Sequence, residues 1–562
     1  MLPPCARDPE GLALLQTCKD NPLDVAPRLI LTDWLEDQGE EELAKCLRES
    51  LKPPHRTLLS GLAKERWAPL THCFNGWLGW EGEFHAETLN TLSDNLWLAG
   101  LEFGYPMLQA EEAAFLAKKL VPKGLTRLHL SLEDAAATSA VVPVLADKSV
   151  SPQLNDLVIF QFETGRIDAI VLAIATSKVL RLDCLSLRGQ ISDRRIRMLT
   201  RFPVLAAAKS LCLSEIRNGD NTAIALARSR QLSNLVELGL TNCGIGVRGI
   251  QALAGSPNLG KIVRLDLSSN PIGTVGAESL AASPHIGQVE QLNLRVNQID
   301  APGVRALGKS PLLSRLTDLD LCHNTIGDTG CRHLACLENF QRLRKLNVSS
   351  NQIGSTGMVA LAESAHLANL ETLDIGGNPI GKAVELVGRF PHLRQLRGLD
   401  ASDINENGDD LAGAIPSLDE LDLERLDLSL NQMNDQGLLA ILESRVMANL
   451  KHLSFCENDV GDEGIMALAR SPAVRNLETL DLMYNQIGDQ GFRGLVNSPH
   501  LEKLVHLNLC QNQIGDAGAI ALANAKDLPN LCTISLDGNP IGEEGRQALA
   551  TSERLKNVRI TL

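Results

Sequence analysis

Residues 485–512 read NQIGDQGFRGLVNSPHLEKLVHLNLCQN, and variants of this repeat recur along most of the chain. The asparagine at both ends of the quoted stretch is its most regular letter, and it returns every 27 residues, as from Asn485 to Asn512. The polar anchor occupies Cys243, Asn270, Asn297, Asn324, Asn351 and Asn378 and, after one shortened repeat, Asn431, Asn458, Asn485, Asn512 and Asn539. A fixed period of this length predicts a solenoid, in which each repeat packs on its two neighbours.

Each repeat combines a strand pattern with a helix pattern. The letters L-x-L before the asparagine, such as Leu265 and Leu267, alternate like a strand with both leucines facing the core. The letters G-x-x-A-L-A after the turn have helical spacing. A Ser-Pro pair is expected to end each helix. The aspartates of the turn are expected to cap their own helices: Asp328, Asp462, Asp489 and Asp516.

These residues resemble the leucine-rich repeat family, and the long helical part of each repeat resembles its ribonuclease-inhibitor-like subclass. The resemblance covers about 460 residues. It implies an α/β solenoid, a horseshoe with a concave parallel β-sheet and convex helices, in which the asparagine side chain bonds to backbone groups inside the turn. The predicted solenoid spans 98–562 with about 17 repeats and is irregular near 396–423.

A different region precedes the solenoid, because all five tryptophans lie within the first 97 residues. The segment PRLILTDWLEDQG at 27–39 resembles the helical repeat-companion domain at the N-terminus of some bacterial repeat proteins. We therefore expect a small α-helical domain at 1–50. Residues 51–97 are predicted to form a linker and an N-terminal cap, since a terminal repeat needs a cover.

Composition restricts the classes of function. The net charge of -15 argues against nucleic-acid and anionic-membrane surfaces and favours a basic protein partner. The first residues, MLPPCARD, have no basic-then-apolar leader, and no segment is long and apolar enough to span a membrane. Thirteen scattered cysteines indicate reduced thiols. We expect a cytoplasmic monomer.

Outward strand positions are predicted to form the binding surface. The residue between the two leucines is an acid in three successive repeats, Asp374, Asp400 and Asp427. These carboxylates repel one another unless a cation, a basic partner or raised pKa values relieve them. Four residues of the kind found at protein-binding hot spots follow at neighbouring outward positions: His452, Met483, Tyr484 and His506. For both groups, an ordinary solvated surface is the alternative.

The irregular repeat between Leu396 and Leu423 has Ile404 at the anchor position. Four polar residues beside it imitate the first half of a calcium loop: Asp403, Asn405, Asn407 and Asp409. The second half fails, because position twelve is Ala414 instead of glutamate. We expect an irregular polar loop, with a calcium site as the weaker alternative. No other metal and no cofactor are predicted.

An enzymatic role is not predicted. The segment GVRALGKS at 303–310 matches a phosphate-loop pattern, but it runs along a helix of the repeat and does not join a strand to a helix. No catalytic constellation has local motif support. We predict an interaction scaffold that binds a protein partner on the concave face. The alternatives are a regulator of an enzyme, such as a GTPase-activating leucine-rich-repeat protein, and a working N-terminal domain that the solenoid presents.

Overall fold

The computed structural model describes residues 57–58, 70–74, 77–81, 100–108, 127–146, 154–161, 165–389, 391–404, 408–525 and 527–562. The helical domain predicted at 1–50 and most of the cap predicted at 51–97 lie outside these residues. The chain forms two compact units, residues 1–270 and 271–562, each of which is described by itself. In the described part of the chain, no helix combines the length and apolar character needed to cross a bilayer.

Unit 1 begins with strands that differ from the repeats. The first three form two antiparallel pairs, β1 with β2 and β2 with β3: β1 (Thr57–Leu58), β2 (Leu70–Phe74) and β3 (Trp77–Glu81). Parallel strands follow: β4 (Gly100–Leu108), β5 (Arg127–Leu132), β6 (Asp156–Gln161), β7 (Cys184–Arg188), β8 (Ser210–Ser214), β9 (Glu237–Thr241) and β10 (Arg264–Asp266). Helices alternate with them: α7 (Ala135–Ala146), α8 (Asp168–Thr176), α9 (Asp193–Leu199), α10 (Gly219–Ala227) and α11 (Val247–Ala254).

Unit 2 repeats one short strand and one helix. The strands are β11 (Gln291–Asn293), β12 (Asp318–Asp320), β13 (Lys345–Asn347), β14 (Thr372–Asp374), β15 (Gly398–Asp400), β16 (Arg425–Asp427), β17 (His452–Ser454), β18 (Thr479–Asp481), β19 (His506–Asn508), β20 (Thr533–Ser535) and β21 (Arg559–Thr561). The helices are α12 (Gly273–Ala281), α13 (Ala301–Lys309), α14 (Gly327–Cys336), α15 (Ser355–Ala362), α16 (Glu385–Arg389), α17 (Gly408–Ala414), α18 (Asp435–Glu443), α19 (Asp462–Arg470), α20 (Asp489–Val496), α21 (Asp516–Asn524) and α22 (Glu543–Thr551).

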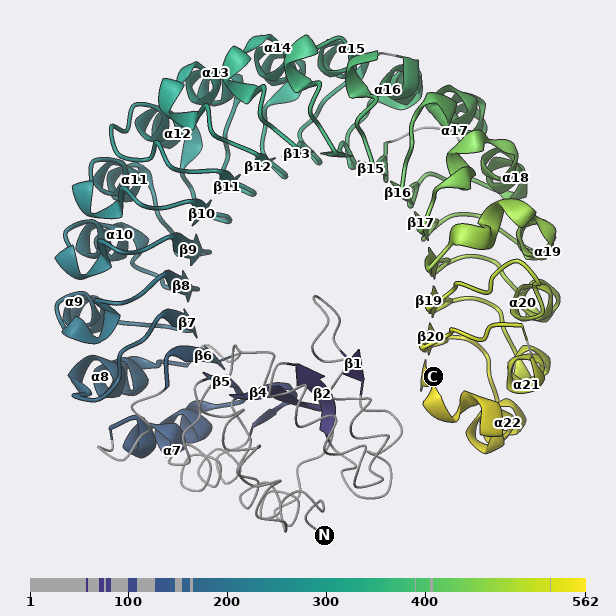
Figure 1. The fold of residues 1–562 in the computed structure, drawn as a ribbon, viewed down its shortest axis with the longest axis horizontal. Helices are drawn as coiled ribbons and strands as arrows, with labels where there is room; N and C mark the ends of the chain where they lie inside the picture. The colour runs from purple at the N-terminus through teal and green to yellow at the C-terminus, as the bar shows by residue number, and fades with distance from the viewer. Residues whose placement is uncertain are drawn as a thin grey trace, which may run out of the picture. The chain divides into compact units, whose positions relative to one another are not determined.

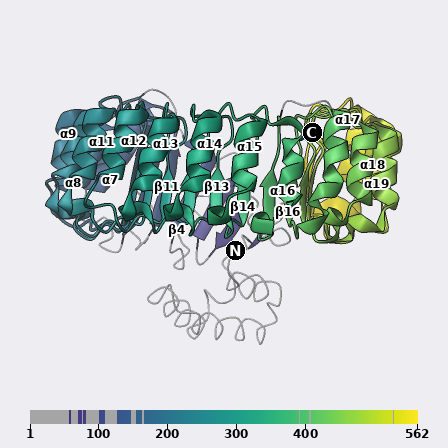
Figure 2. The ribbon, with the colours of Figure 1, turned by 90° about the horizontal axis from the view of Figure 1, so that it is seen from above.

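The strands of unit 2 are parallel and in register, so that equivalent leucines such as Leu319 and Leu346 are paired. Within this unit the strands line the inner side and the helices form the outer side (Figure 1). Helices α12 to α15 lie side by side when seen from above (Figure 2). Both leucines of the L-x-L pattern are buried, as the strand period requires. The predicted α/β solenoid with parallel strands is therefore confirmed.

The anchor asparagines satisfy the buried backbone of the turn. The Nδ2 atom of Asn324 donates to the carbonyls of Leu294 and Leu321, at 2.9 and 2.8 Å. Its Oδ1 atom accepts from the backbone N–H groups of Asn297 and Ile299 in the preceding repeat, at 3.1 and 2.8 Å. One side chain thus pairs buried groups that would otherwise lack partners, which is the role that the family resemblance implied.

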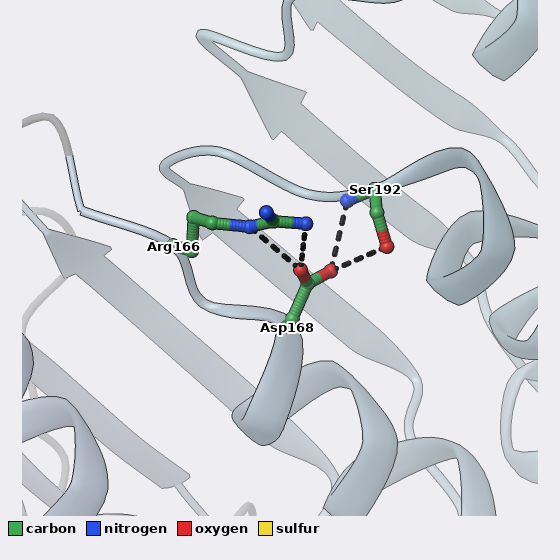
Figure 3. Close-up of polar contacts among 3 residues, drawn as sticks. All are labelled: Arg166, Asp168 and Ser192. Carbon is green, nitrogen blue, oxygen red and sulfur yellow. Dashed lines mark hydrogen bonds and ion pairs between the residues drawn. The ribbon is translucent and has the colours of Figure 1, made fainter.

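The aspartate of the turn acts on a different helix from the one predicted. Asp462 is the first residue of α19, yet its Oδ1 atom accepts at 2.7 Å from the backbone N–H of Gly488, which precedes α20. Figure 3 shows the same arrangement in unit 1, where Asp168 of α8 accepts from the N–H and Oγ of Ser192, before α9. Each aspartate therefore caps the helix of the next repeat, because the stacked helices place that N-terminus beside it.

The serine of the Ser-Pro pair bonds to the helix of the preceding repeat, whereas the aspartate bonds to that of the following repeat. Ser498 follows α20, and its Oγ atom donates to the carbonyl of Ala469, at the end of α19, at 2.6 Å. Ser310 does the same to Ala281 at 2.6 Å. Both ends of a helix are consequently satisfied by its neighbours, the N-terminus from the preceding repeat and the C-terminus from the following one.

The shortened repeat has a local physical cause. Ile404 has no side-chain oxygen to offer the N–H groups of Asn378 and Ile380, as a regular asparagine would. The N–H of Ile380 instead donates a hydrogen bond to the carbonyl of Asn378, at 2.7 Å. The following helix starts as a 3-10 turn, η9 (Gly381–Val384), and α16 is only five residues long.

Candidate functional site on the inner strand face

The polar residues between the two leucines support the turn that follows each strand. Asp400 accepts from the N–H and Oγ of Ser402, at 3.0 and 2.6 Å. Asn347 makes the same pair of bonds with Ser349, at 3.0 and 2.6 Å. An amide and a carboxylate therefore serve this turn equally, so the turn requires a polar side chain but not a charge.

The three predicted acids lie together. Asp374 is in register with Asp400, and Asp400 with Asp427, on adjacent parallel strands. Burial, followed by the charge of Asp400, raises the pKa of Asp374 to about 7. Burial and the charge of Asp400 also raise the pKa of Asp427, against the opposing hydrogen bond from Ser429. Near neutral pH, these carboxylates therefore share fewer than three full charges.

The two histidines occupy equivalent strand positions but are not on adjacent strands. His452 pairs with Thr479, and Thr479 pairs with His506, so one strand separates the imidazoles. The Nδ1 atom of His506 lies 2.7 Å from Oγ1 of Thr533. Burial, followed by the charge of Arg425, lowers the pKa of His452. Among the described residues, no group of three His, Cys, Asp or Glu side chains is arranged to hold a metal ion.

Met483 and Tyr484 lie in the loop directly after β18. Tyr484 is 49% exposed and has a left-handed backbone, with φ of 53°. The residue before the anchor has this conformation in every regular repeat of unit 2, and most such residues are small or polar. Leu430 and Val296 occupy the same position with φ of 62° and 54°, and they are 45% and 42% exposed.

Val296, Leu430 and Tyr484 thus place bulky side chains on a left-handed backbone. Left-handed backbone is unfavourable for side chains other than glycine, asparagine and aspartate, and most of all for β-branched valine. The loops are stacked by hydrogen bonds from Leu430 N–H to Cys456 O and from Glu457 N–H to Met483 O, at 2.9 and 2.8 Å. Leu430 and Tyr484 thus lie two repeats apart along one edge of the inner face.

Sequence reasoning found Tyr484 but missed Leu430 and Val296. A bulky apolar letter directly before the anchor asparagine was the available signal. The calcium-loop candidate is only partly described. Asp403 is exposed and takes the left-handed position, with φ of 47°. Asn405, Asn407 and the side chain of Asp409 lie outside the described residues.

Comparison with known proteins agrees with this geometry. Nine segments match the Leucine Rich repeat family: 231–254, 261–281, 314–335, 341–362, 366–383, 422–442, 446–469, 475–496 and 500–523. The chain therefore carries leucine-rich repeats, a class whose curved arrays provide extended inner surfaces for binding. The ribonuclease-inhibitor-like subclass and the companion-like domain stay predictions.

Three solved structures are similar to this chain. An internalin from Listeria monocytogenes is 19% identical, with 66% of this chain and 93% of that chain covered and a TM-score of 0.38. A leucine-rich-repeat protein of Leptospira interrogans is 18% identical, with 86% and 99% covered and a TM-score of 0.36. The Rad7 and Elc1 complex of yeast gives 14% identity, 80% and 92% coverage and a TM-score of 0.40. A search of curated proteins found no match.

Proposed function

We propose that unit 2 is a non-enzymatic scaffold that binds a basic protein partner on its inner strand face. The observation that carries this proposal is the exposure of Leu430 and Tyr484 on a left-handed backbone at one edge of that face. The left-handed conformation belongs to every regular repeat, but glycine or asparagine would adopt it more easily than these bulky side chains, whose strain costs on the order of 1–3 kcal/mol.

The chemistry of these residues supports a protein partner. Tyrosine is enriched at the centre of protein interfaces, and exposed apolar side chains lose water favourably when they are covered. Met483 lies next to Tyr484 and offers an adaptable thioether to the same surface. A partner segment with an apolar side chain for each of Leu430 and Tyr484 would span two repeats.

The acids beside these residues support a basic partner. Asp374, Asp400 and Asp427 form a continuous row, and the charge of Asp400 disfavours ionisation of both neighbours. A lysine or arginine from a partner would relieve this repulsion and stabilise the ionised forms. Complementary charge would also speed association at low salt.

A monomeric, cytoplasmic chain belongs to the same proposal. The described cysteines, Cys243 among them, are free thiols, which supports a reducing compartment. Size-exclusion chromatography with light scattering tests the monomer directly.

The test is cross-linking capture from cell lysate with the parent chain and three variants. Leu430→Asn with Tyr484→Asn removes the apolar contacts at positions where asparagine suits the backbone. Asp400→Asn removes one charge and keeps an acceptor for Ser402. Val275→Asn is the matched control, since Val275 is 51% exposed on the outer helix α12.

We expect a partner that the parent and the Val275 variant capture equally, that the double variant loses, and that Asp400→Asn weakens. Direct binding of the purified partner should weaken with salt, as expected for a basic protein. Equal capture by the parent and the double variant would overturn the proposal. If a captured protein is a GTPase and this chain stimulates its nucleotide hydrolysis, the chain is a regulator of an enzyme and not a scaffold.

A further inference from the structure

Helices α19 and α20 leave a cavity on the outer side of unit 2, away from the strands. Its volume is about 520 Å³, which lies in the range of small-molecule sites. Met466, Ala469 and Gly494 contribute apolar or small surfaces. Arg470, Arg493 and His500 contribute basic side chains, and no carboxylate is among the described residues that line the cavity.

The cavity depends on one departure from the repeat. Gly494 occupies the helix position that is Ala467 in α19, Ala521 in α21 and Ala548 in α22. Glycine inside a helix is less stable than alanine, so local structure gives no reason for it here. Its missing side chain leaves space between the two helices.

Packing does not require this glycine. A Cβ atom added at Gly494 would lie 3.4 Å from Cγ of Met466, which is an ordinary contact. Gly491, one turn earlier in the same helix, is different, because a Cβ atom there would lie 2.6 Å from Oδ1 of Asp462. Gly491 is thus explained by the capping aspartate, whereas Gly494 is explained only by the cavity.

The basic side chains of the cavity are available to a ligand. Elsewhere in unit 2, arginines pair across repeats, as Arg315 does with Glu290 at 3.1 Å. Within the described ranges, neither Arg470 nor Arg493 has a hydrogen bond or ion pair from its guanidinium group. Both arginines are exposed, and together they bring two positive charges to one cavity. Guanidinium groups match carboxylate and phosphate oxygens in shape and charge.

We propose that this cavity binds a small organic anion. Its carboxylate or phosphate group would lie between Arg470 and Arg493, and its apolar part would cover Met466 and Ala469. This site lies on helices and not on strands, so it is independent of the partner surface. Occupation would join α19 to α20 without contact to the inner face.

Calorimetric titration of the full chain tests the site with phenyl phosphate and benzoate, and with inorganic phosphate for comparison. Phenyl phosphate or benzoate should bind, and about tenfold more tightly than inorganic phosphate, because only they have an apolar part. Gly494→Ala should weaken binding about tenfold or more while the melting temperature rises, since alanine fills the cavity and favours the helix.

Arg470→Gln with Arg493→Gln should abolish binding. Arg546→Gln is the matched control, because Arg546 is an exposed arginine on α22, away from the cavity, and it should leave the affinity unchanged. The proposal is overturned if neither organic anion binds, or if binding survives both Gly494→Ala and the double arginine variant. The rise in melting temperature shows that loss of binding by Gly494→Ala is not loss of folding.

Discussion

The Oδ1 atom of Asp489 accepts a hydrogen bond of 2.7 Å from the backbone N–H of Gly515, which lies 26 residues further along the chain. The same oxygen accepts from Gly518 at 2.8 Å. Both N–H groups belong to the start of α21, where no partner within the helix exists for them. The repeat that contains Asp489 therefore stabilises the helix of its successor.

Asp489→Ala should lower the free energy of unfolding by about 1–2 kcal/mol, the usual loss for a capping side chain. Asp489→Asn should lose less, because an amide oxygen remains as acceptor. Urea unfolding measures the loss, and hydrogen exchange locates it. Faster exchange is expected at Gly515 and Gly518. Faster exchange confined to α20 would instead mean that Asp489 caps its own helix.

Two glycines of α20 should respond to alanine in opposite directions. Gly494→Ala should stabilise the protein by about 1 kcal/mol, the helix preference of alanine over glycine. Gly491→Ala should destabilise it, because the new Cβ atom would lie 2.6 Å from Oδ1 and 2.9 Å from Cα of Asp462. Thermal unfolding of both variants under the same conditions decides. If both alanine variants are more stable than the parent, Asp462 can move away from the new Cβ atom at position 491 without a loss of stability.

Val296→Asn should stabilise the protein by about 1 kcal/mol, because asparagine tolerates the left-handed backbone that strains valine. Asn242 already occupies the equivalent position in unit 1 with φ of 53°. The control is Val275→Asn, an exposed valine in the helix α12, where no such gain is expected. Denaturant unfolding compares the two. An equal effect would point to exposure of valine, and not to backbone strain.

Stability should depend on the ionisation of Asp374. Its pKa rises from 3.8 to about 7 in the folded protein, so the folded state holds the proton more tightly than the unfolded state does. The stability that this proton provides is complete below pH 4 and is lost as the pH rises through about 7. Asp374→Asn removes the ionisation, and its stability relative to the parent should therefore increase by about 4 kcal/mol from pH 4 to pH 8. A constant difference across that range would contradict the raised pKa.

The same ionisation should control partner binding. A basic partner favours ionised Asp374, so affinity should increase as the pH rises from about 6 to about 8. Isothermal titration at several pH values, in buffers with different ionisation enthalpies, would show release of a proton on binding. Asp374→Asn should abolish the proton release. Proton uptake would be evidence against a basic partner.

Most of the regular fold could be predicted from the sequence because each recurring residue of the repeat has a structural role within one or two repeats. Asn324 had to bond the backbone of a tight turn, and its partners lie in its own repeat and the preceding one. The capping role of Asp462 was predicted, but on the wrong helix. A pattern with a period of 27 residues does not say which of two stacked helices an aspartate reaches, since both begin with the same letters.

The site was predicted in part for a related reason. The row of Asp374, Asp400 and Asp427 followed directly from the strand period, and the register confirms it. Leu430 was missed because its significance lies in its place directly before the anchor asparagine, where the backbone is left-handed, and not in leucine itself. Gly494 was missed because its significance lies in the difference from alanine at the same helix position, not in a motif. Ile404 shows the reverse case, where the departing letter itself marked the irregular repeat.

The forward caps have a consequence for the length of the array. From Asp435 to Gly545 each capping aspartate faces the glycines that open the next helix. Removing residues 463–489 would join Asp462 to Gln490, and Asp462 would then stand where Asp489 stood, before Gly515. Deletion or insertion of whole repeats therefore keeps a capping aspartate for each helix. A deletion of any other length leaves the start of a helix without the carboxylate that accepts from its N–H groups.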